Sequence, residues 1–256
     1  MSLYHRSLGK GPPLILLHGL FGSSDNWVSF AKRLASDYHV LLLDLPNHGR
    51  SPHTNEFNFE SLATHVLRFI KQHGWEQVYL AGHSLGGKVG MQLLNQAPDL
   101  IKAIAVLDIH FKAYSGGHEI ILDALLKLPL HSLTSRQDAE DWLKEHLPDA
   151  GIRQFLLKNL YRSGDSFSWK FNLPVINRDY NQVLKAIPIK QPVETPSLFL
   201  RGGKSSYILD EDIPLIQAIF NHVDIETIPE AGHWIHVDAP DELFLHLFRF
   251  FKSHSS

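Results

Sequence analysis

Short, nearly continuous hydrophobic runs alternate along the chain with longer segments whose hydrophobic positions recur at a helical period. This alternation is typical of helices packed on both faces of a mostly parallel sheet, because a strand covered on both faces is hydrophobic at every position. The fold class is therefore predicted to be α/β. Strands are expected at residues 14–17, 40–43, 78–81, 103–107, 197–200 and 223–228. Helices are expected at residues 26–36, 59–73, 85–96, 211–220 and 240–252.

Residues 109–194 interrupt this alternation. The segment has helical patterning at residues 119–128, 138–146 and 152–161 but no buried parallel strand, and the strand-helix rhythm resumes at Pro196. We therefore predict one core, made of residues 1–108 and 195–256. Residues 109–194 are expected to form a mainly helical lid inserted between two strands of the sheet.

Composition narrows the class of protein. Hydrophobic residues at 44% and charged residues at 20% are ordinary for a globular chain, and the net charge of -3 gives no reason to expect nucleic acid or an anionic membrane as a partner. The chain has no cysteine, which excludes disulfides and thiolate chemistry and favours a reducing compartment. No signal peptide pattern and no bilayer-spanning apolar run are found. These features predict a cytoplasmic protein without membrane insertion, and a monomer is the default expectation.

A serine between glycines marks the candidate chemistry. Gly82-His83-Ser84-Leu85-Gly86 follows the strand predicted at residues 78–81 and precedes a predicted helix. A tight strand-to-helix turn of the form G-x-S-x-G holds its serine in a strained conformation, with the hydroxyl exposed, and small neighbours avoid clashes. Ser84 is therefore predicted to be a nucleophile.

Two further segments supply the groups that such a nucleophile needs. His18-Gly19-Leu20-Phe21-Gly22 follows the first hydrophobic strand, and its Leu20 N–H is expected to form an oxyanion hole together with Leu85 N–H. His233, in Ala231-Gly232-His233-Trp234, follows the last predicted strand. An imidazole there can take the serine proton and return it to the leaving group.

At this point the residues resemble the α/β-hydrolase family over essentially the whole chain. H-G-L-F-G, D-L-P-N-H-G-R-S, G-H-S-L-G-G and A-G-H-W occur in the family's order. Within the family, G-H-S-L-G-G-K, F-L-L-K and F-L-R-G-G-K-S-S-Y look most like the YbfF-type acyl-ester and acyl-CoA hydrolases. The resemblance implies a Ser-His-acid triad on an eight-stranded type of sheet, with residues 109–194 as a lid. It also implies esterase or thioesterase activity with no cofactor.

The acid of the triad departs from the common pattern. Many family members carry it in a G-x-x-D turn after the strand that follows the lid, but here that turn reads R-G-G-K-S-S. Asp108 ends the strand at residues 103–107, beside the nucleophile strand, and the YbfF-type resemblance also favours it. Asp210 and Asp212 remain alternatives, although acids at that place are explained as groups at a helix N-terminus.

Other charged residues have competing interpretations. Asp44, in D-L-P-N-H-G-R-S, is assigned a structural role. Lys88 stands in the first turn of the helix after Ser84, where a cation opposes the helix dipole. It is expected to pair with a buried acid or to bind an anionic part of the substrate, and the structural role is favoured. His233 and His236 do not belong to a recognisable metal-ligand motif, so no metal site is predicted.

Apolar side chains in and near the insertion indicate the substrate. An apolar roof over the site favours acyl chains over sugars or phosphorylated metabolites. The substrate-binding candidates are Phe21, Phe155, Trp169, Phe171, Tyr207 and Lys88, with Leu156, Leu173 and Val175 on the same apolar surface.

The predicted function is a serine hydrolase that cleaves small-molecule carboxylic esters or acyl thioesters, acyl-CoA among them, on a Ser84-His233-Asp108 triad. C–C bond hydrolysis or perhydrolysis on the same triad is the alternative among enzymes. A ligand-binding protein with slow turnover is the alternative from another class.

Overall fold

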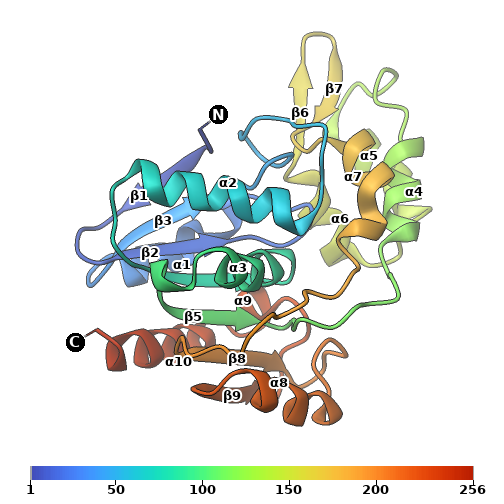
Figure 1. Cartoon of the computed structure of the whole chain (residues 1–256). Helices are drawn as coiled ribbons and strands as arrows, with labels where there is room; N and C mark the ends of the chain where they lie inside the picture. The colour runs from blue at the N-terminus through green and yellow to red at the C-terminus, as the bar shows by residue number, and fades with distance from the viewer. Residues whose placement is uncertain (1, 256) are drawn as a thin grey trace.

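The computed structural model describes residues 2–255, and its centre is a seven-stranded sheet in the order β1-β3-β2-β4-β5-β8-β9 (Figure 1). β1 pairs antiparallel with β3, and all other neighbours in this sheet are parallel. The predicted α/β class and mostly parallel sheet are therefore confirmed. The strands are β1 (His5–Leu8), β2 (Pro13–Leu17), β3 (His39–Leu43), β4 (Val78–His83), β5 (Ile101–Leu107), β8 (Ser197–Gly202) and β9 (Val223–Ile228).

The eight-stranded type of sheet implied by the resemblance is not found in the described part of the chain. Only one strand, β1, precedes β2, and it forms the antiparallel edge of the sheet. β1 was not predicted because its four residues, H-R-S-L, are partly exposed and lack a hydrophobic run.

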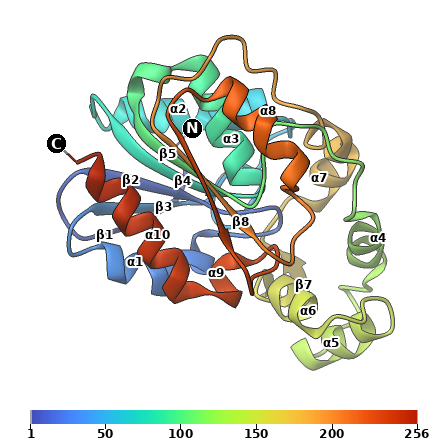
Figure 2. The same cartoon turned by 90° about the horizontal axis from the view of Figure 1, so that it is seen from below.

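Helices cover both faces of the sheet, as Figure 2 shows. α1 (Val28–Leu34), α9 (Ile235–Asp238) and α10 (Pro240–Ser253) lie on one face, and α2 (Phe59–Gln72), α3 (Leu85–Gln96) and α8 (Ile213–Ile219) lie on the other. Alternate residues of β2 enter different cores: Ile15 and Leu17 pack on the α2 side, and Leu14 and Leu16 pack on the α1 side. This double burial explains the continuous hydrophobicity of the strand.

Between β5 and β8 the chain leaves the sheet and forms a separate group of elements. These are α4 (Glu119–Lys127), α5 (Arg136–Lys144), α6 (Ala150–Leu157), β6 (Leu160–Ser163), β7 (Ser166–Trp169) and α7 (Leu173–Asp179). β6 and β7 form an antiparallel hairpin, so the helix expected to run to residue 161 ends earlier, at Leu157. The hairpin turns at Gly164, whose φ of +62° suits glycine.

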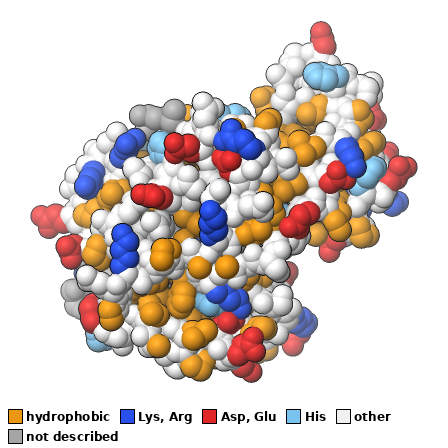
Figure 3. All heavy atoms as spheres, turned by 45° about the vertical axis from the view of Figure 1, so that its right-hand side comes forward, with side chains coloured by type: hydrophobic (Ala, Val, Ile, Leu, Met, Phe, Trp, Pro, Cys, Tyr) orange, Lys and Arg blue, Asp and Glu red, His pale blue; other side chains and the backbone are white. Residues whose placement is uncertain are grey.

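This inserted group lies at the end of the sheet where the loops after the parallel strands emerge (Figure 1). In the space-filling view it forms a smaller lobe beside the main body, and hydrophobic side chains gather along the junction (Figure 3). Ligands of open α/β sheets bind at the carboxyl ends of their strands, so this junction is where a site is expected. Within residues 2–255, no helix is both long and apolar enough to cross a membrane.

Candidate active site

Ser84 occupies a strained turn between β4 and α3. Its backbone φ is +50° and ψ is -114°, a conformation that L residues rarely adopt. A Cβ at position 82 would lie 2.4 Å from the carbonyl carbon of Gly86, and one at position 86 would lie 2.7 Å from Leu17 Cβ. Only glycine fits at these two positions, so the glycines around the serine are explained by close approach of the backbone.

Ser84, His233 and Asp108 come together from three separate loops. His233 Nε2 lies 3.0 Å from Ser84 Oγ, and His233 Nδ1 lies 2.7 Å from Asp108 Oδ2. Asp108 is completely buried and also accepts hydrogen bonds from Gly202 N, at 2.9 Å, and from Ser205 Oγ. This arrangement can pass a proton from the hydroxyl to the imidazole and stabilise the resulting imidazolium.

The two alternative acids lie elsewhere. Asp210 pairs with Arg201 at 2.6 Å. Asp212 accepts from Lys112 Nζ and lies 3.2 Å from His110 Nε2. Among the three aspartates considered from the sequence, Asp108 is the one whose carboxylate contacts the His233 ring.

Two neighbours orient His233. The Tyr207 ring stacks on its imidazole, with ring centroids 3.9 Å apart and planes inclined by 15°. His83 Nε2 lies 2.7 Å from the His233 carbonyl oxygen. Because a carbonyl only accepts, Nε2 is the protonated nitrogen of His83 and donates this hydrogen bond. Burial lowers the pKa of His83 well below its ordinary value, which keeps the ring neutral. The role of His83 was missed because the motif leaves the position before the serine unspecified.

The loop after β2 presents Leu20 beside Ser84. Leu85 is the first residue of α3, so its N–H has no partner within the helix. The carbonyl of Gly19 accepts from Gly22 N at 2.9 Å and lies 2.8 Å from His18 Nδ1. The Gly19 carbonyl and the Leu20 N–H belong to the same peptide group, and in a trans peptide they point in opposite directions. The Leu20 N–H therefore points away from Gly22 N and His18 Nδ1.

Phe21, the next residue of this loop, is held from both sides. Its φ is +59°, which a phenylalanine adopts only under constraint. Phe21 N donates to His48 Nε2 at 3.3 Å, and burial lowers the pKa of His48 to about 3, so the ring is neutral and can accept. The carbonyl of Phe21 accepts from Asn159 Nδ2 at 2.7 Å. Asn159 belongs to the insertion, and no sequence motif pointed to it.

A cavity of about 450 Å³ opens beside the Ser84 hydroxyl. Ser84 and His233 line it, together with Phe21, Phe155 and Tyr207 among the predicted substrate-binding residues. The insertion also contributes Ile121, Ile152 and Leu156 to its wall.

Trp169 and Phe171 do not line this cavity. They stack on each other with ring centroids 5.2 Å apart, and Phe171 packs against the Phe21 ring at the same centroid distance. Both are buried behind Phe21, and Leu173 and Val175 are likewise buried core residues. These four are packing residues, which corrects the predicted substrate contact of Trp169 and Phe171.

Lys88 is buried at the base of the insertion. Its Nζ donates to the carbonyls of Lys112 and Lys185, each at 2.7 Å, where the chain leaves and re-enters the core. The ammonium also lies 4.8 Å from the centre of the Tyr114 ring. Burial lowers the pKa of Lys88 to about 7. Its partners are carbonyls and an aromatic face instead of the buried acid considered from the sequence.

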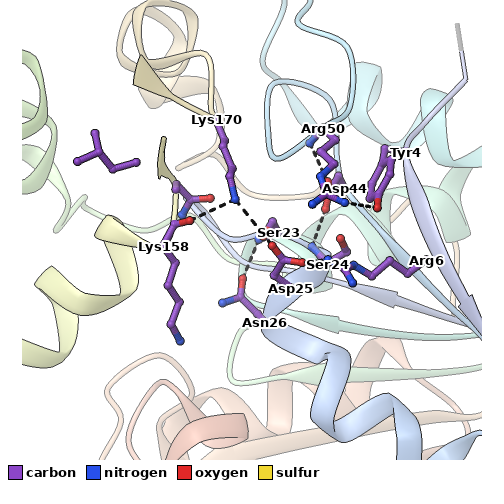
Figure 4. A network of polar contacts seen from close by, with 12 residues as sticks. Tyr4, Arg6, Ser23, Ser24, Asp25, Asn26, Asp44, Arg50, Lys158 and Lys170 are labelled. Atoms are coloured by element: carbon purple, nitrogen blue, oxygen red, sulfur yellow. Dashed lines mark hydrogen bonds and ion pairs between the residues drawn. The ribbon is translucent and has the colours of Figure 1, made fainter. Parts of the chain in front are cut away.

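Asp44 joins loops next to the candidate oxyanion hole (Figure 4). Its carboxylate accepts from Ser24 N and, at 2.8 Å, from Arg50 N. In the same network Lys170 Nζ, from the insertion, lies 3.8 Å from Asp25 Oδ2. These contacts agree with a structural role for Asp44.

No group of three or more potential metal ligands is found among residues 2–255. The histidines near Ser84 instead contact backbone groups and aromatic rings, as the His83 and His18 contacts show.

Comparisons with known proteins identify the family of the chain. The family model described as alpha/beta hydrolase fold matches residues 12–125. The sn-1-specific diacylglycerol lipase ABHD11 of Danio rerio is 35% identical over 253 residues, covering 95% of this chain and 80% of that protein. Esterase YbfF of Escherichia coli K12 is 32% identical over 241 residues, covering 93% of this chain and 92% of the relative. A solved structure named "Marine microorganism esterase" is 38% identical, with a TM-score of 0.95 over 97% of this chain and 99% of that one.

Proposed function

Because the chain belongs to the α/β-hydrolase family, we propose that it is a carboxylesterase-type serine hydrolase that works through an acyl-enzyme on Ser84, His233 and Asp108. The observation that carries this proposal is His233, whose two ring nitrogens lie 3.0 Å from Ser84 Oγ and 2.7 Å from Asp108 Oδ2. The names of the relatives, an esterase and a lipase, support cleavage of carboxylic esters.

In the first half of the reaction, Ser84 Oγ attacks the ester carbonyl carbon while His233 Nε2 takes the hydroxyl proton. The carbonyl oxygen becomes an oxyanion that accepts from Leu20 N–H and Leu85 N–H. When the C–O bond to the alcohol breaks, His233 returns the proton to the departing alkoxide, and the acyl group stays on Ser84.

In the second half, water enters and His233 Nε2 removes one of its protons. The hydroxide attacks the acyl carbon, the oxyanion forms again, and the bond to Ser84 Oγ breaks. The proton on His233 then returns to Ser84, and the carboxylic acid leaves.

Each group has a defined electrostatic task in these steps. Asp108 holds His233 Nδ1–H and stabilises the imidazolium, and its burial among fixed donors makes that interaction strong. Each oxyanion donor contributes about 3 kcal/mol to the stabilisation of the transition state.

Residues 109–194 act as a lid over the site in this proposal, and Ile152, Phe155 and Leu156 give it an apolar inner surface. Such a surface suits apolar acyl or alcohol groups. Acyl thioesters, including acyl-CoA, are further substrates because the same triad chemistry cleaves them. A cytoplasmic monomer without membrane insertion remains the prediction from the sequence.

The first experiment is steady-state hydrolysis of p-nitrophenyl esters from acetyl to palmitoyl, alongside matching acyl-CoAs, with Ser84→Ala as the control. We expect turnover that disappears in Ser84→Ala, together with an acyl mass on Ser84 after rapid quenching. Turnover that survives in Ser84→Ala would contradict the proposal. Tight binding without turnover would instead favour the slow ligand-binding protein.

A further inference from the structure

Two cavities meet at Ser84. Besides the cavity of about 450 Å³, a second one of about 40 Å³ reaches the serine from the side of α3. Both are bordered by Leu20, Ser84, His118 and Tyr207. An ester bound at Ser84 therefore has two different spaces for its two halves.

The position of His233 distinguishes the two spaces. The leaving alcohol must receive its proton from His233 Nε2, so the alcohol oxygen has to lie within hydrogen-bond reach of that atom. His233 lines the large cavity and is not among the residues that line the small one. Leu85 lines the small cavity and not the large one. In the proposed function its N–H donates to the oxyanion.

Resting on the proposed function, we propose that the small cavity is the acyl pocket and that the enzyme prefers esters of short-chain acids, with the bulk of the substrate on the alcohol side. One water requires about 10 to 15 Å³ of cavity, so about 40 Å³ holds roughly three non-hydrogen atoms. With the carbonyl carbon at Ser84, the pocket accepts acyl groups up to about four carbons.

The walls of the small cavity are apolar and firmly held. Ile109, Val183 and Leu184 line it, and Lys88, another lining residue, is fixed by the bonds of its ammonium to two carbonyls. Tyr114, another wall residue, donates from its N–H to the Leu184 carbonyl at 2.8 Å and from its hydroxyl to the Tyr207 carbonyl at 2.9 Å. These bonds link three residues that line the cavity, and they oppose widening of the pocket by a longer chain.

The large cavity can accommodate a larger alcohol group, and it is lined by both apolar and polar side chains. The Phe155 and Trp234 rings pack 5.3 Å apart on its wall, and Asn26, Asp149 and Asp238 add polar groups. An alcohol that carries both apolar and polar parts is matched by this lining.

Two ester series with unmodified protein test the assignment. The first varies the acyl group from acetyl to octanoyl on p-nitrophenol, and the second varies the alcohol from ethyl to octyl in acetate esters. We expect kcat/KM to fall at least tenfold from butyryl to octanoyl and to fall less than tenfold across the alcohol series. A kcat/KM that rises through octanoyl would overturn the acyl assignment while leaving the serine hydrolase intact. Absence of Ser84-dependent hydrolysis in both series would instead reject the proposed function.

Matched variants then locate the pocket. Leu184→Ala enlarges the small cavity and leaves the backbone bond from Tyr114 in place, so the octanoyl-to-acetyl ratio of kcat/KM should rise at least tenfold. Val183→Ala provides an independent enlargement if Leu184→Ala does not fold. Phe155→Ala, in the large cavity, is the control and should change the alcohol series but not the acyl ratio. A shift of the acyl ratio by Phe155→Ala alone would place the acyl group in the large cavity and overturn the proposal.

Discussion

Ser205 Oγ donates a hydrogen bond to Asp108 Oδ2, the same oxygen that lies 2.7 Å from His233 Nδ1. Asp108 follows β5, and Ser205 stands in the turn after β8, where the common family pattern has an acid. The two loops therefore converge on one point. The carboxylate comes from one strand, and the neighbouring strand supplies a hydroxyl that fixes it.

The acid assignment is tested by Asp108→Asn. The amide has nearly the shape of the carboxylate but cannot stabilise the imidazolium, and we expect kcat to fall roughly 10³- to 10⁴-fold. Asp210→Asn is the matched control, because Asp210 contacts Arg201 on the surface. Steady-state kinetics on one p-nitrophenyl ester decides between them: activity kept in Asp108→Asn and lost in Asp210→Asn would reverse the assignment.

The convergence of the two loops also predicts that the acid can be moved. Asp108 has a φ of +49°, so Asp108→Gly suits the backbone and leaves space where the carboxylate was. Adding Ser205→Asp places a carboxylate on the opposite loop, from which it can reach His233 Nδ1. We expect the double variant to recover at least tenfold in kcat over Asp108→Gly. Equal rates for the two would show that the loop after β8 cannot present an acid to the imidazole.

Much of the fold was predictable because a strand buried on both faces is a continuous hydrophobic run in the sequence. Leu14, Ile15, Leu16 and Leu17 are all buried, and such runs marked each central parallel strand. The β6–β7 hairpin was missed for the opposite reason. Its strands have four residues each, and β6 is mostly exposed, so the local pattern merges with that of the preceding helix.

In the site, Ser84, His233 and Asp108 could be proposed from the sequence because each stands in a motif or at the end of a predicted strand, whereas Asn159 and His83 could not. Ser84 stands out because its glycines are required by close backbone contacts. Asn159 and His83 bond to carbonyls 138 and 150 positions away, and a polar residue in the sequence carries no sign of such a partner. Trp169 and Phe171 were misassigned because an aromatic pair in a core looks the same in sequence as one in a pocket.

Residues 18–22, which carry Leu20, form the candidate oxyanion loop, and the Asn159 contact makes this loop dependent on the insertion. Asn159→Ala leaves the carbonyl of the buried residue Phe21 without its donor. This should lower the free energy of unfolding by about 1–3 kcal/mol and loosen the loop that carries Leu20. We expect kcat to fall roughly tenfold with little change in KM, because the oxyanion exists only in the transition state. Affinity for a trifluoromethyl ketone inhibitor should weaken in parallel with kcat/KM.

The control for Asn159→Ala is Asn172→Ala. Asn172 Nδ2 also joins the insertion to the core, at 3.0 Å from Asn47 Oδ1, but it does not touch the oxyanion loop. Its variant should lose stability without the parallel loss of inhibitor affinity. Equal effects of both variants on the inhibitor would mean that general loosening of the insertion, and not the Phe21 contact, is responsible.

Lys88 is predicted to hold the insertion in place and not to bind an anionic group of the substrate. Lys88→Met keeps the length of the side chain but leaves the carbonyls of Lys112 and Lys185 without a donor, so the free energy of unfolding should fall by about 1–3 kcal/mol. Denaturant unfolding measures this. In kinetics, kcat/KM for butyrate and hemisuccinate esters should change by the same factor. A selective loss for the hemisuccinate ester would show that the ammonium pairs with an anionic acyl group.

Buried histidines predict that the protein loses stability in mild acid. Burial lowers the pKa of His110 to about 4 and that of His48 to about 3, so between pH 6.5 and about 4 these rings take up protons only in the unfolded chain. The unfolded state then binds more protons, and stability falls as the pH falls, by about 1.4 kcal/mol per pH unit for each such ring well below pH 6.5. Denaturant unfolding at pH 7, 6 and 5 gives this slope.

His110→Gln isolates one of these rings. It should reduce the loss of unfolding free energy between pH 7 and pH 5 by about 2 kcal/mol, because its side chain no longer takes up a proton on unfolding. His131→Gln, at an exposed position of the insertion, should leave the slope unchanged. If both variants keep the parental slope, His110 is already protonated in the folded protein, and the buried pair with Asp212 at 3.2 Å is an ion pair rather than a neutral contact.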